Sequence, residues 1–202
     1  MERRFLWLLL GMLAVLLVAA GVLLFGQRSF YRGVLYEPPQ AAYDFQLPAA
    51  SGGTTSLHEM RGKLVLLFFG YTSCPDVCPT TMAVLRQVTS DLGALADGVQ
   101  VVFISVDPER DTPQRVQGYV SAFDPRFIGL SGSLDQLEAV WQAYGVYRQV
   151  DDASASLAGY LVAHSTRLYL IDPQGDLLLS YSYGTPPEDI LSDLRRLLRK
   201  ND

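Results

Sequence analysis

The chain has 202 residues, of which 49% are hydrophobic and 18% charged, and its 16 basic and 21 acidic residues give a net charge of −5. This length accommodates one membrane segment and one domain with a sizeable core. A weakly acidic chain without a basic stripe lacks the electrostatic footprint of a nucleic-acid-binding protein, so we expect no nucleic-acid partner.

The N-terminal part of the chain carries the pattern of a membrane anchor. Residues 5–25 form a run of 21 residues without a charge, which suffices to cross a hydrocarbon core at about 1.5 Å per residue. A cleaved signal peptide would have a shorter apolar region and a small-residue cleavage site. Residues 18–20 offer only a weak site, and the apolar run continues beyond it. We therefore predict a short tail over 1–4, an uncleaved transmembrane helix over 5–26, a linker over 27–42 and one domain over 43–202.

The domain begins with a weak strand pattern that is followed by a strong one. Residues 43–47 alternate in polarity and meet Pro48, which is typical of an edge strand. His58 follows without a partner motif, and we interpret it as a surface histidine. In residues 63–69, Lys63 is followed by an unbroken apolar run, which predicts a central strand covered on both faces.

The two cysteines of the chain, Cys74 and Cys78, lie between this strand and a predicted helix. Apolar residues recur at roughly helical spacing up to Gly93, a candidate C-cap. If the helix begins near Pro75 or Pro79, both thiols lie at or just before its first turn. Unpaired N–H groups and the positive end of the helix dipole favour thiolates there, so we expect an ionisable, reactive pair.

The CxxxC spacing of these cysteines admits three kinds of site. Two thiolates four positions apart can converge on one centre, and they are soft donors that suit Cu(I) or Zn. The same pair could close a structural disulfide. A CxxC spacing would have indicated thioredoxin-type redox exchange, but the extra residue changes the bite of the sulfurs. The spacing alone leaves metal binding, redox exchange and a structural disulfide open.

Residues 99–106 predict a second buried strand, which ends at an acidic loop. Asp107, Glu109 and Asp111 lie in this loop. Ligands of open α/β sheets gather at the carboxyl ends of strands, and the cysteine loop also lies at such an end. These acids therefore either contact a partner or tune a metal site, or they cap and salt-bridge their own loop.

The C-terminal half supplies the remaining elements. Thr112 with Pro113 predicts a helix start, Ser133 and Gln136 form a candidate capping box, and the small polar residues 151–156 predict a mobile loop. The other patterns are a helix with Trp141 in the core that ends at Gly145, a strand-turn-strand unit over 167–181, and a helix over 186–198. This order predicts an α/β, thioredoxin-like sandwich, with a central mixed sheet flanked by helices.

Three stretches together resemble one known family. They are FGYTSCPDVCP at residues 69–79, SVDPERDTP at 105–113, and His164-Ser165-Thr166 ahead of YLIDP at 169–173. In this order they resemble the SCO/SenC family of membrane-anchored, thioredoxin-like copper proteins, which help assemble the copper A centre of cytochrome c oxidase. The resemblance runs from about Tyr43 to the C-terminus. It implies that Cys74, Cys78 and His164 bind copper.

The resemblance also implies a cycle and a place in the cell. A thioredoxin-like reductant would open a redox disulfide between Cys74 and Cys78, and copper, as Cu(I) with Cu(II) as the alternative, would then enter. The domain would pass it to the copper A subunit of cytochrome c oxidase, with other periplasmic copper chaperones as further partners. The short N-terminal tail and the resemblance place the chain as a single-pass protein of the bacterial inner membrane, with its C-terminal domain in the periplasm or outside.

Two observations qualify this interpretation. The metal-binding histidine of the family usually follows an aspartate, whereas Ala163 precedes His164 here. This chain therefore lacks, at that position, an acid that could orient the imidazole ring or help to release copper. The alternative function is an enzyme, a thiol-disulfide oxidoreductase or thiol peroxidase that uses the same cysteines. Thioredoxin-type oxidoreductases usually carry a cis-proline near the position of Thr166, and no proline occurs there. We therefore expect a metallochaperone more than an enzyme, with thiol-disulfide reductase activity as an addition.

Overall fold

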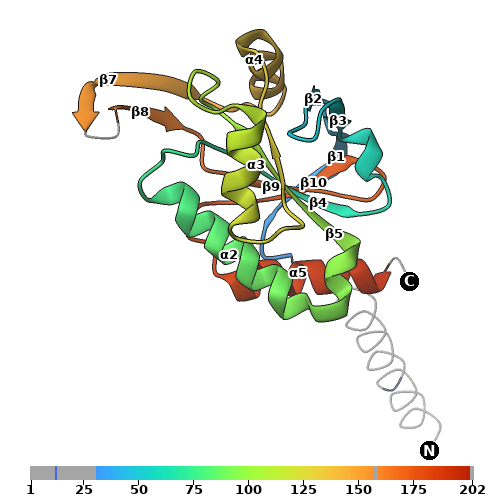
Figure 1. The fold of residues 1–202 in the computed structure, drawn as a ribbon. Coiled ribbons are helices and arrows are strands. Elements are labelled where there is room, and N and C mark those ends of the chain that lie inside the picture. Colours follow the sequence, from blue (N-terminus) through green and yellow to red (C-terminus); the bar gives the residue numbers. More distant parts are fainter. Residues whose placement is uncertain (1–11, 13–30, 157–158, 201–202) are drawn as a thin grey trace, which may run out of the picture. The chain divides into compact units, whose positions relative to one another are not determined.

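The computed structural model describes residues 12, 31–156 and 159–200 (Figure 1). A compact unit begins at Arg32 and holds all the elements discussed below. The transmembrane helix predicted over 5–26 lies outside the described residues, apart from Met12. Within the part of the chain that the structure describes, no helix combines the length and the apolar character needed to cross a membrane.

The domain contains the predicted strands and helices in their predicted order, with β1, β6 and the β7-β8 pair in addition. In chain order, its elements are β1 Val34–Ala41, β2 Gln46–Pro48, β3 Thr54–Ser56, the 3-10 helix η1 His58–Met60, β4 Leu64–Gly70, α2 Val77–Leu92, the 3-10 helix η2 Gly93–Gly98, β5 Val99–Ser105, α3 Pro113–Ser121, β6 Ile128–Leu130, α4 Leu134–Ala143, β7 Arg148–Ser156, β8 Gly159–His164, β9 Leu168–Ile171, β10 Asp176–Tyr181 and α5 Pro187–Lys200.

Six of these strands form one mixed sheet in the order β1-β10-β9-β4-β5-β6. Strands β4, β5 and β6 run parallel, whereas β9 is antiparallel to both β4 and β10. Helices α2 and α5 lie side by side along the sheet (Figure 1). The pairs β2-β3 and β7-β8 form two small separate sheets. The predicted central mixed sheet flanked by helices is confirmed.

Strand β4 is the centre of the core, since all seven of its residues are buried. Phe68 packs against Phe103 of β5, with 5.9 Å between the ring centroids, and Phe103 in turn contacts Tyr119 of α3. Phe69 contacts Tyr144, which ends α4. Because neighbouring side chains of a strand point to opposite faces, α3 and α4 cover opposite sides of the sheet. This confirms the predicted buried strand.

The helix ends follow from local sequence chemistry. The hydroxyl of Thr112 accepts a backbone N–H in the first turn of α3, with Pro113 at the first helical position. Ser133 and Gln136 form the predicted capping box of α4. Gly93 ends α2 with a φ of 59°, a backbone conformation that side chains with a Cβ rarely adopt. All three predictions are confirmed.

The predicted linker over 27–42 is wrong for residues 34–41, because these form β1 at the edge of the main sheet. Pro38 and Pro39 had suggested a linker. They lie in an irregular stretch between Leu35 and Gln40, where the ladder with β10 is interrupted. An edge strand tolerates such residues because one of its sides needs no hydrogen-bonding partner. The domain therefore begins before Tyr43.

The mobile loop predicted over 151–156 is also wrong. These residues belong to β7, which pairs antiparallel with β8 in a hairpin. The hairpin extends away from the main sheet (Figure 1). Backbone hydrogen bonds between β7 and β8 define these strands, and an apolar periodicity is not needed. Small polar residues therefore do not exclude a strand there. The hairpin matters for function because β8 ends at His164.

Candidate metal centre

Three segments that are distant in the sequence meet at one end of the central strands of the sheet. Parallel strands β4 and β5 end there, and the N–H of Val106 donates to the carbonyl of Gly70 at 2.8 Å. Strand β9 runs antiparallel to β4 and begins at the same end, with Leu168 opposite Phe68. The segment that links β8 to β9 therefore reaches this end as well. It carries His164 to the end of the strand that precedes the cysteines.

The cysteines lie where a turn passes into a helix. Cys74 is the fourth residue of a turn, and its N–H donates to the carbonyl of Tyr71 at 3.2 Å. Helix α2 begins at Val77, so Cys78 lies in its first turn. The helix start thus falls between Pro75 and Pro79, as predicted. Cys78 is fully buried, whereas Cys74 is partly exposed.

Gly70 makes room for Cys78. A Cβ at residue 70 would lie 2.8 Å from Sγ of Cys78 and 2.9 Å from the ring of Phe103, closer than van der Waals contact permits. Any larger residue would push the thiol or the ring aside. No role for Gly70 was predicted from the sequence, where it is a glycine at the end of an apolar run and inside the family motif.

The imidazole of His164 points toward the thiols. Its Nε2 lies 3.7 Å from Sγ of Cys78, and its Nδ1 lies 2.8 Å from the carbonyl oxygen of Ser165. A carbonyl only accepts, so Nδ1 carries the proton and Nε2 presents its lone pair to the sulfurs. One ligand atom each of Cys74, Cys78 and His164 lies within 4.8 Å of the others. The structure brings the three predicted residues together.

The Ser165 carbonyl explains how His164 is oriented although an alanine, Ala163, precedes it in place of the family's usual aspartate. Histidine ligands commonly donate their second ring N–H to a carboxylate or a backbone carbonyl, which fixes the tautomer and the ring orientation. Here the carbonyl of Ser165 takes that hydrogen bond. The ring of Tyr71 packs edge-on against the imidazole, with 5.7 Å between the centroids. The orientation of His164 therefore needs no acid at residue 163.

The two thiols share one proton unequally. The hydrogen bond with Cys78 lowers the pKa of Cys74 to about 3, against the opposing effect of burial. The same hydrogen bond, together with burial, raises the pKa of Cys78 above its ordinary value. Without metal, the pair is therefore a thiolate at the exposed cysteine and a thiol at the buried one.

This inequality gives a pH-dependent prediction. Because a lowered pKa keeps a group ionised at all pH values above it, Cys74 is a thiolate at neutral pH, whereas an ordinary thiol with a pKa of about 8.5 is mostly protonated. In the reduced protein, iodoacetamide should therefore label Cys74 first, at a rate that stays flat from about pH 5 to pH 8. Mass spectrometry of early time points identifies the site. A rate that rises about tenfold per pH unit in this range would contradict the assignment.

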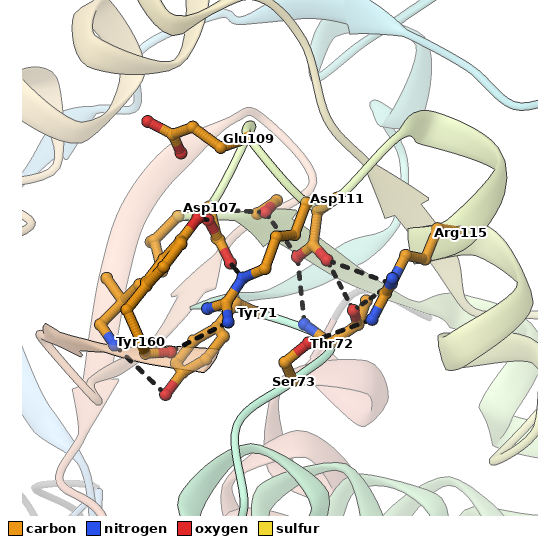
Figure 2. Close-up of polar contacts among 12 residues, drawn as sticks. Tyr71, Thr72, Ser73, Asp107, Glu109, Asp111, Arg115 and Tyr160 are labelled. Carbon is orange, nitrogen blue, oxygen red and sulfur yellow. Dashed lines mark hydrogen bonds and ion pairs between the residues drawn. The ribbon is translucent and has the colours of Figure 1, made fainter. Parts of the chain in front are cut away.

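The acidic loop carries interactions within the protein. Asp107 and Asp111 are buried, and both accept hydrogen bonds from neighbouring segments (Figure 2). Glu109 forms an ion pair with Arg148 of β7, with 2.8 Å between the charged atoms. The three acids bond within the protein, but not only within their own loop, because Asp111 accepts from Thr72, Asp107 from Tyr160 of β8, and Glu109 pairs with a residue of β7.

Two further predictions concern residues outside the site. His58 is exposed, and it lies in η1 apart from the three-residue cluster. Trp141 is a core residue, as predicted, and its indole N–H donates to the carbonyl of Ser105 at 3.1 Å. The aromatic ring thus supports the end of β5, at the edge where the cysteines lie.

Fold and site together define a class of protein. A mixed sheet with two thiols at the start of helix α2 is typical of a thioredoxin-like domain, and the added imidazole turns the dithiol into a soft three-donor site. The chain belongs to the SCO1/SenC family, whose model matches residues 35–199. The match begins inside β1, so the family resemblance extends further toward the N-terminus than Tyr43.

Relatives in sequence share this assignment. The chain is 34% identical over 152 residues to a SCO2-like protein of Rickettsia felis, and the aligned region covers 75% of this chain and 74% of that protein. It is 39% identical over 155 residues to the mitochondrial SCO2 homolog of Bos taurus, and this alignment covers 76% of the chain and 58% of that protein. A relative in Stutzerimonas stutzeri, 39% identical over 123 residues, is described as a putative copper-binding protein and matches 60% of this chain and 59% of its own length.

Solved structures agree with this picture. The apo Sco1 protein of Thermus thermophilus superposes with a TM-score of 0.75 at 36% identity, over 85% of this chain and 99% of that one. ScoI of Bradyrhizobium japonicum, solved with copper bound, gives 0.70 at 38% identity, over 78% and 99%. BsSco, a member of the Sco family of cytochrome c oxidase assembly proteins, shares the fold at 24% identity, with a TM-score of 0.64 over 85% and 99%. The chain is a Sco-family protein in which Cys74, Cys78 and His164 form a candidate metal site.

Proposed function

We propose that this protein is a membrane-anchored copper chaperone that binds Cu(I) through Cys74, Cys78 and His164. It would deliver copper to the copper A centre of cytochrome c oxidase, or prepare that centre for copper. The observation that carries the proposal is the convergence of two sulfurs and one imidazole nitrogen within 4.8 Å. Few, soft ligands of this kind suit Cu(I). Copper-bound ScoI of Bradyrhizobium japonicum supports the choice of metal.

The residues divide the work of loading and release. Copper is the cargo, and it needs deprotonated sulfurs. Cys74 is the partly exposed thiolate, so incoming copper would meet it first, and Cys78 would lose its proton as the metal binds. The neutral Nε2 of His164 would complete the site from the other side. An acceptor would reach the copper from the side of Cys74, because Cys78 is buried.

The cellular setting belongs to the same proposal. The protein would span the bacterial inner membrane once, through residues 5–26, and hold its domain in the periplasm or outside. An oxidising compartment competes with copper by joining Cys74 to Cys78, so a thioredoxin-like reductant would have to return the pair to the dithiol. The copper A subunit and other periplasmic copper chaperones are the proposed exchange partners.

Titration of the reduced full-length chain with Cu(I), without oxygen and against a chelator of known affinity, tests the proposal. Saturation at one copper per chain is expected, because the described residues offer one cluster of this composition. Transfer to an apo copper A domain should follow on mixing. The absence of tight uptake would contradict copper binding, whereas uptake without transfer would contradict delivery to that centre.

A second candidate is a thiol-disulfide oxidoreductase or a thiol peroxidase that uses the same cysteines. The lowered pKa of Cys74 favours it, because a partly exposed thiolate is the attacking group in disulfide exchange. Reduction of insulin disulfides or of peroxide by the copper-free dithiol distinguishes the two functions. Fast turnover of either substrate without copper would favour the enzyme.

A further inference from the structure

The acidic loop between β5 and α3 contacts both halves of the metal centre. One part, which we call the thiol clamp, consists of Asp111 of the loop and Arg115 in the first turn of α3, and it holds the turn before Cys74. The other part, the hairpin clamp, consists of Asp107 and Arg110 and holds β8, the strand that ends at His164. Figure 2 shows both sets of contacts around the one loop.

The thiol clamp fixes the two central residues of the turn that ends at Cys74. The carboxylate of Asp111 accepts from the N–H of Thr72 at 3.0 Å and from its hydroxyl at 2.5 Å. Arg115 donates to the hydroxyls of Thr72 and Ser73 at 2.8 and 3.0 Å. Asp111 also accepts from the hydroxyl of Ser105 at the end of β5. The turn is thereby tied to the edge of the sheet.

The hairpin clamp fixes β8 four residues before its end. The hydroxyl of Tyr160 donates to the carboxylate of Asp107 at 2.6 Å, and Arg110 donates to the carbonyl of Tyr160 at 2.9 Å. The guanidinium of Arg110 lies 3.7 Å from the centre of the Tyr160 ring and 5.5 Å from that of Tyr71. Asp107 itself is fully buried. The hairpin is thus attached to the loop that also holds the cysteines.

We infer that Asp111 and Tyr160 are positioning residues of the metal centre, Asp111 for the thiol pair and Tyr160 for the imidazole. The inference rests on the proposed function. The two clamps are joined through one short loop. The distance between the two sulfurs and the imidazole of His164 therefore depends on that loop as well as on the ligand residues themselves. Neither residue is itself a ligand, so each acts through the segment that it holds.

The Asp111→Asn variant tests the thiol clamp. An amide replaces one acceptor oxygen by a donor, so one of the donors on Thr72 or Ser105 loses its partner. We expect the Cu(I) affinity of the full-length chain to fall about 10- to 100-fold, the range for residues that orient metal ligands. The same fall should remain in a His164→Ala background, because the thiols alone are affected.

The Tyr160→Phe variant tests the hairpin clamp. Its effect on the copper affinity should depend on the presence of His164, unlike that of Asp111→Asn. It removes one hydroxyl and keeps the ring that stacks on Arg110. We expect the Cu(I) affinity to fall about 10-fold, with no further fall in the His164→Ala background. The ring-proton resonances of His164 should also shift in the copper-free protein. An equal loss with and without His164, or unchanged resonances and affinity, would overturn the assignment of Tyr160.

A copper-independent measurement separates this inference from the proposed function. The equilibrium between the Cys74–Cys78 disulfide with two glutathiones and the dithiol with glutathione disulfide reports how closely the thiols are held. Asp111→Asn should shift it toward the dithiol about 10-fold, because the effective concentration of the two thiols falls. If the wild-type chain binds no copper, the proposed function fails, but this equilibrium and the His164 resonances still test the two clamps.

Asp124→Asn is the matched control. Asp124 is also a buried acid paired with an arginine, Arg126 at 2.6 Å, and it lies in the loop after α3, away from the cysteine turn. Its replacement should lower the melting temperature and leave the copper affinity and the disulfide equilibrium unchanged. If Asp111→Asn gives that same pattern, Asp111 only stabilises the fold. If Asp111→Asn does not fold, Thr72→Val removes the contacted hydroxyl alone and should show the same direction of change.

Discussion

Replacement of Cys78 by serine is expected to abolish useful copper binding, with a fall in Cu(I) affinity of about 100- to 1000-fold. This range follows from a binding free energy of about 10–16 kcal/mol for a structural zinc site of four ligands, hence about 2.5–4 kcal/mol per ligand. A hydroxyl is a hard donor that Cu(I) does not favour. Competition against a Cu(I) chelator at fixed pH measures the change.

The fold should survive this replacement. Serine is close in size to cysteine, and Cys78 lies in the first turn of α2 with its thiol in a pocket bounded by Gly70. Circular dichroism and the melting temperature of the copper-free protein provide the control. The full-length Cys74→Ser variant should lose copper to a similar degree. Wild-type affinity in either folded variant would remove that cysteine from the site.

Replacement of His164 by alanine is the second large effect, with an expected loss of Cu(I) affinity of about 10- to 100-fold. The loss should be smaller than for a cysteine, because two thiolates alone still make a linear Cu(I) site, which suits a metal that accepts few soft ligands. The ultraviolet charge-transfer bands of the copper-loaded chain should shift as the nitrogen donor leaves. Added imidazole should partly restore them.

The chain supplies its own control for this experiment. His58 is the other histidine of the sequence, and it is exposed in η1. His58→Ala should leave both the affinity and the bands unchanged. If the two alanine variants bind copper equally well, the imidazole of His164 does not take part in the site, and weight moves to thiol redox chemistry.

Local chemistry explains why so much of the domain was predictable. The apolar run that became β4 is buried along its whole length, and a strand covered on both faces needs such a run. Thr112, Ser133 and Gly93 cap helices through their own side chain or backbone. Each of these features depends on a few adjacent residues, so the sequence displays it directly.

Two predictions failed where pairing with another strand, near or distant in the chain, decides the structure. Strand β1 is a strand because β10 lies beside it, although two prolines interrupt its pattern. Strand β7 is a strand because β8 pairs with it. Edge strands and isolated hairpins bury little apolar surface, so they leave no periodic pattern to recognise.

The same distinction applies to the metal centre. The candidate donors were visible in the sequence, because two cysteines near a helix start and a histidine in a family motif predicted them, and the cysteine turn was correctly expected at the end of a buried strand. The folded structure was needed to show why Gly70 carries no side chain and which acids hold the two halves of the site together. The hydrogen bonds of Asp111 and Asp107 join residues 39 and 53 positions apart in the chain, and hydrogen bonds at that range arise only when the sheet brings the segments together.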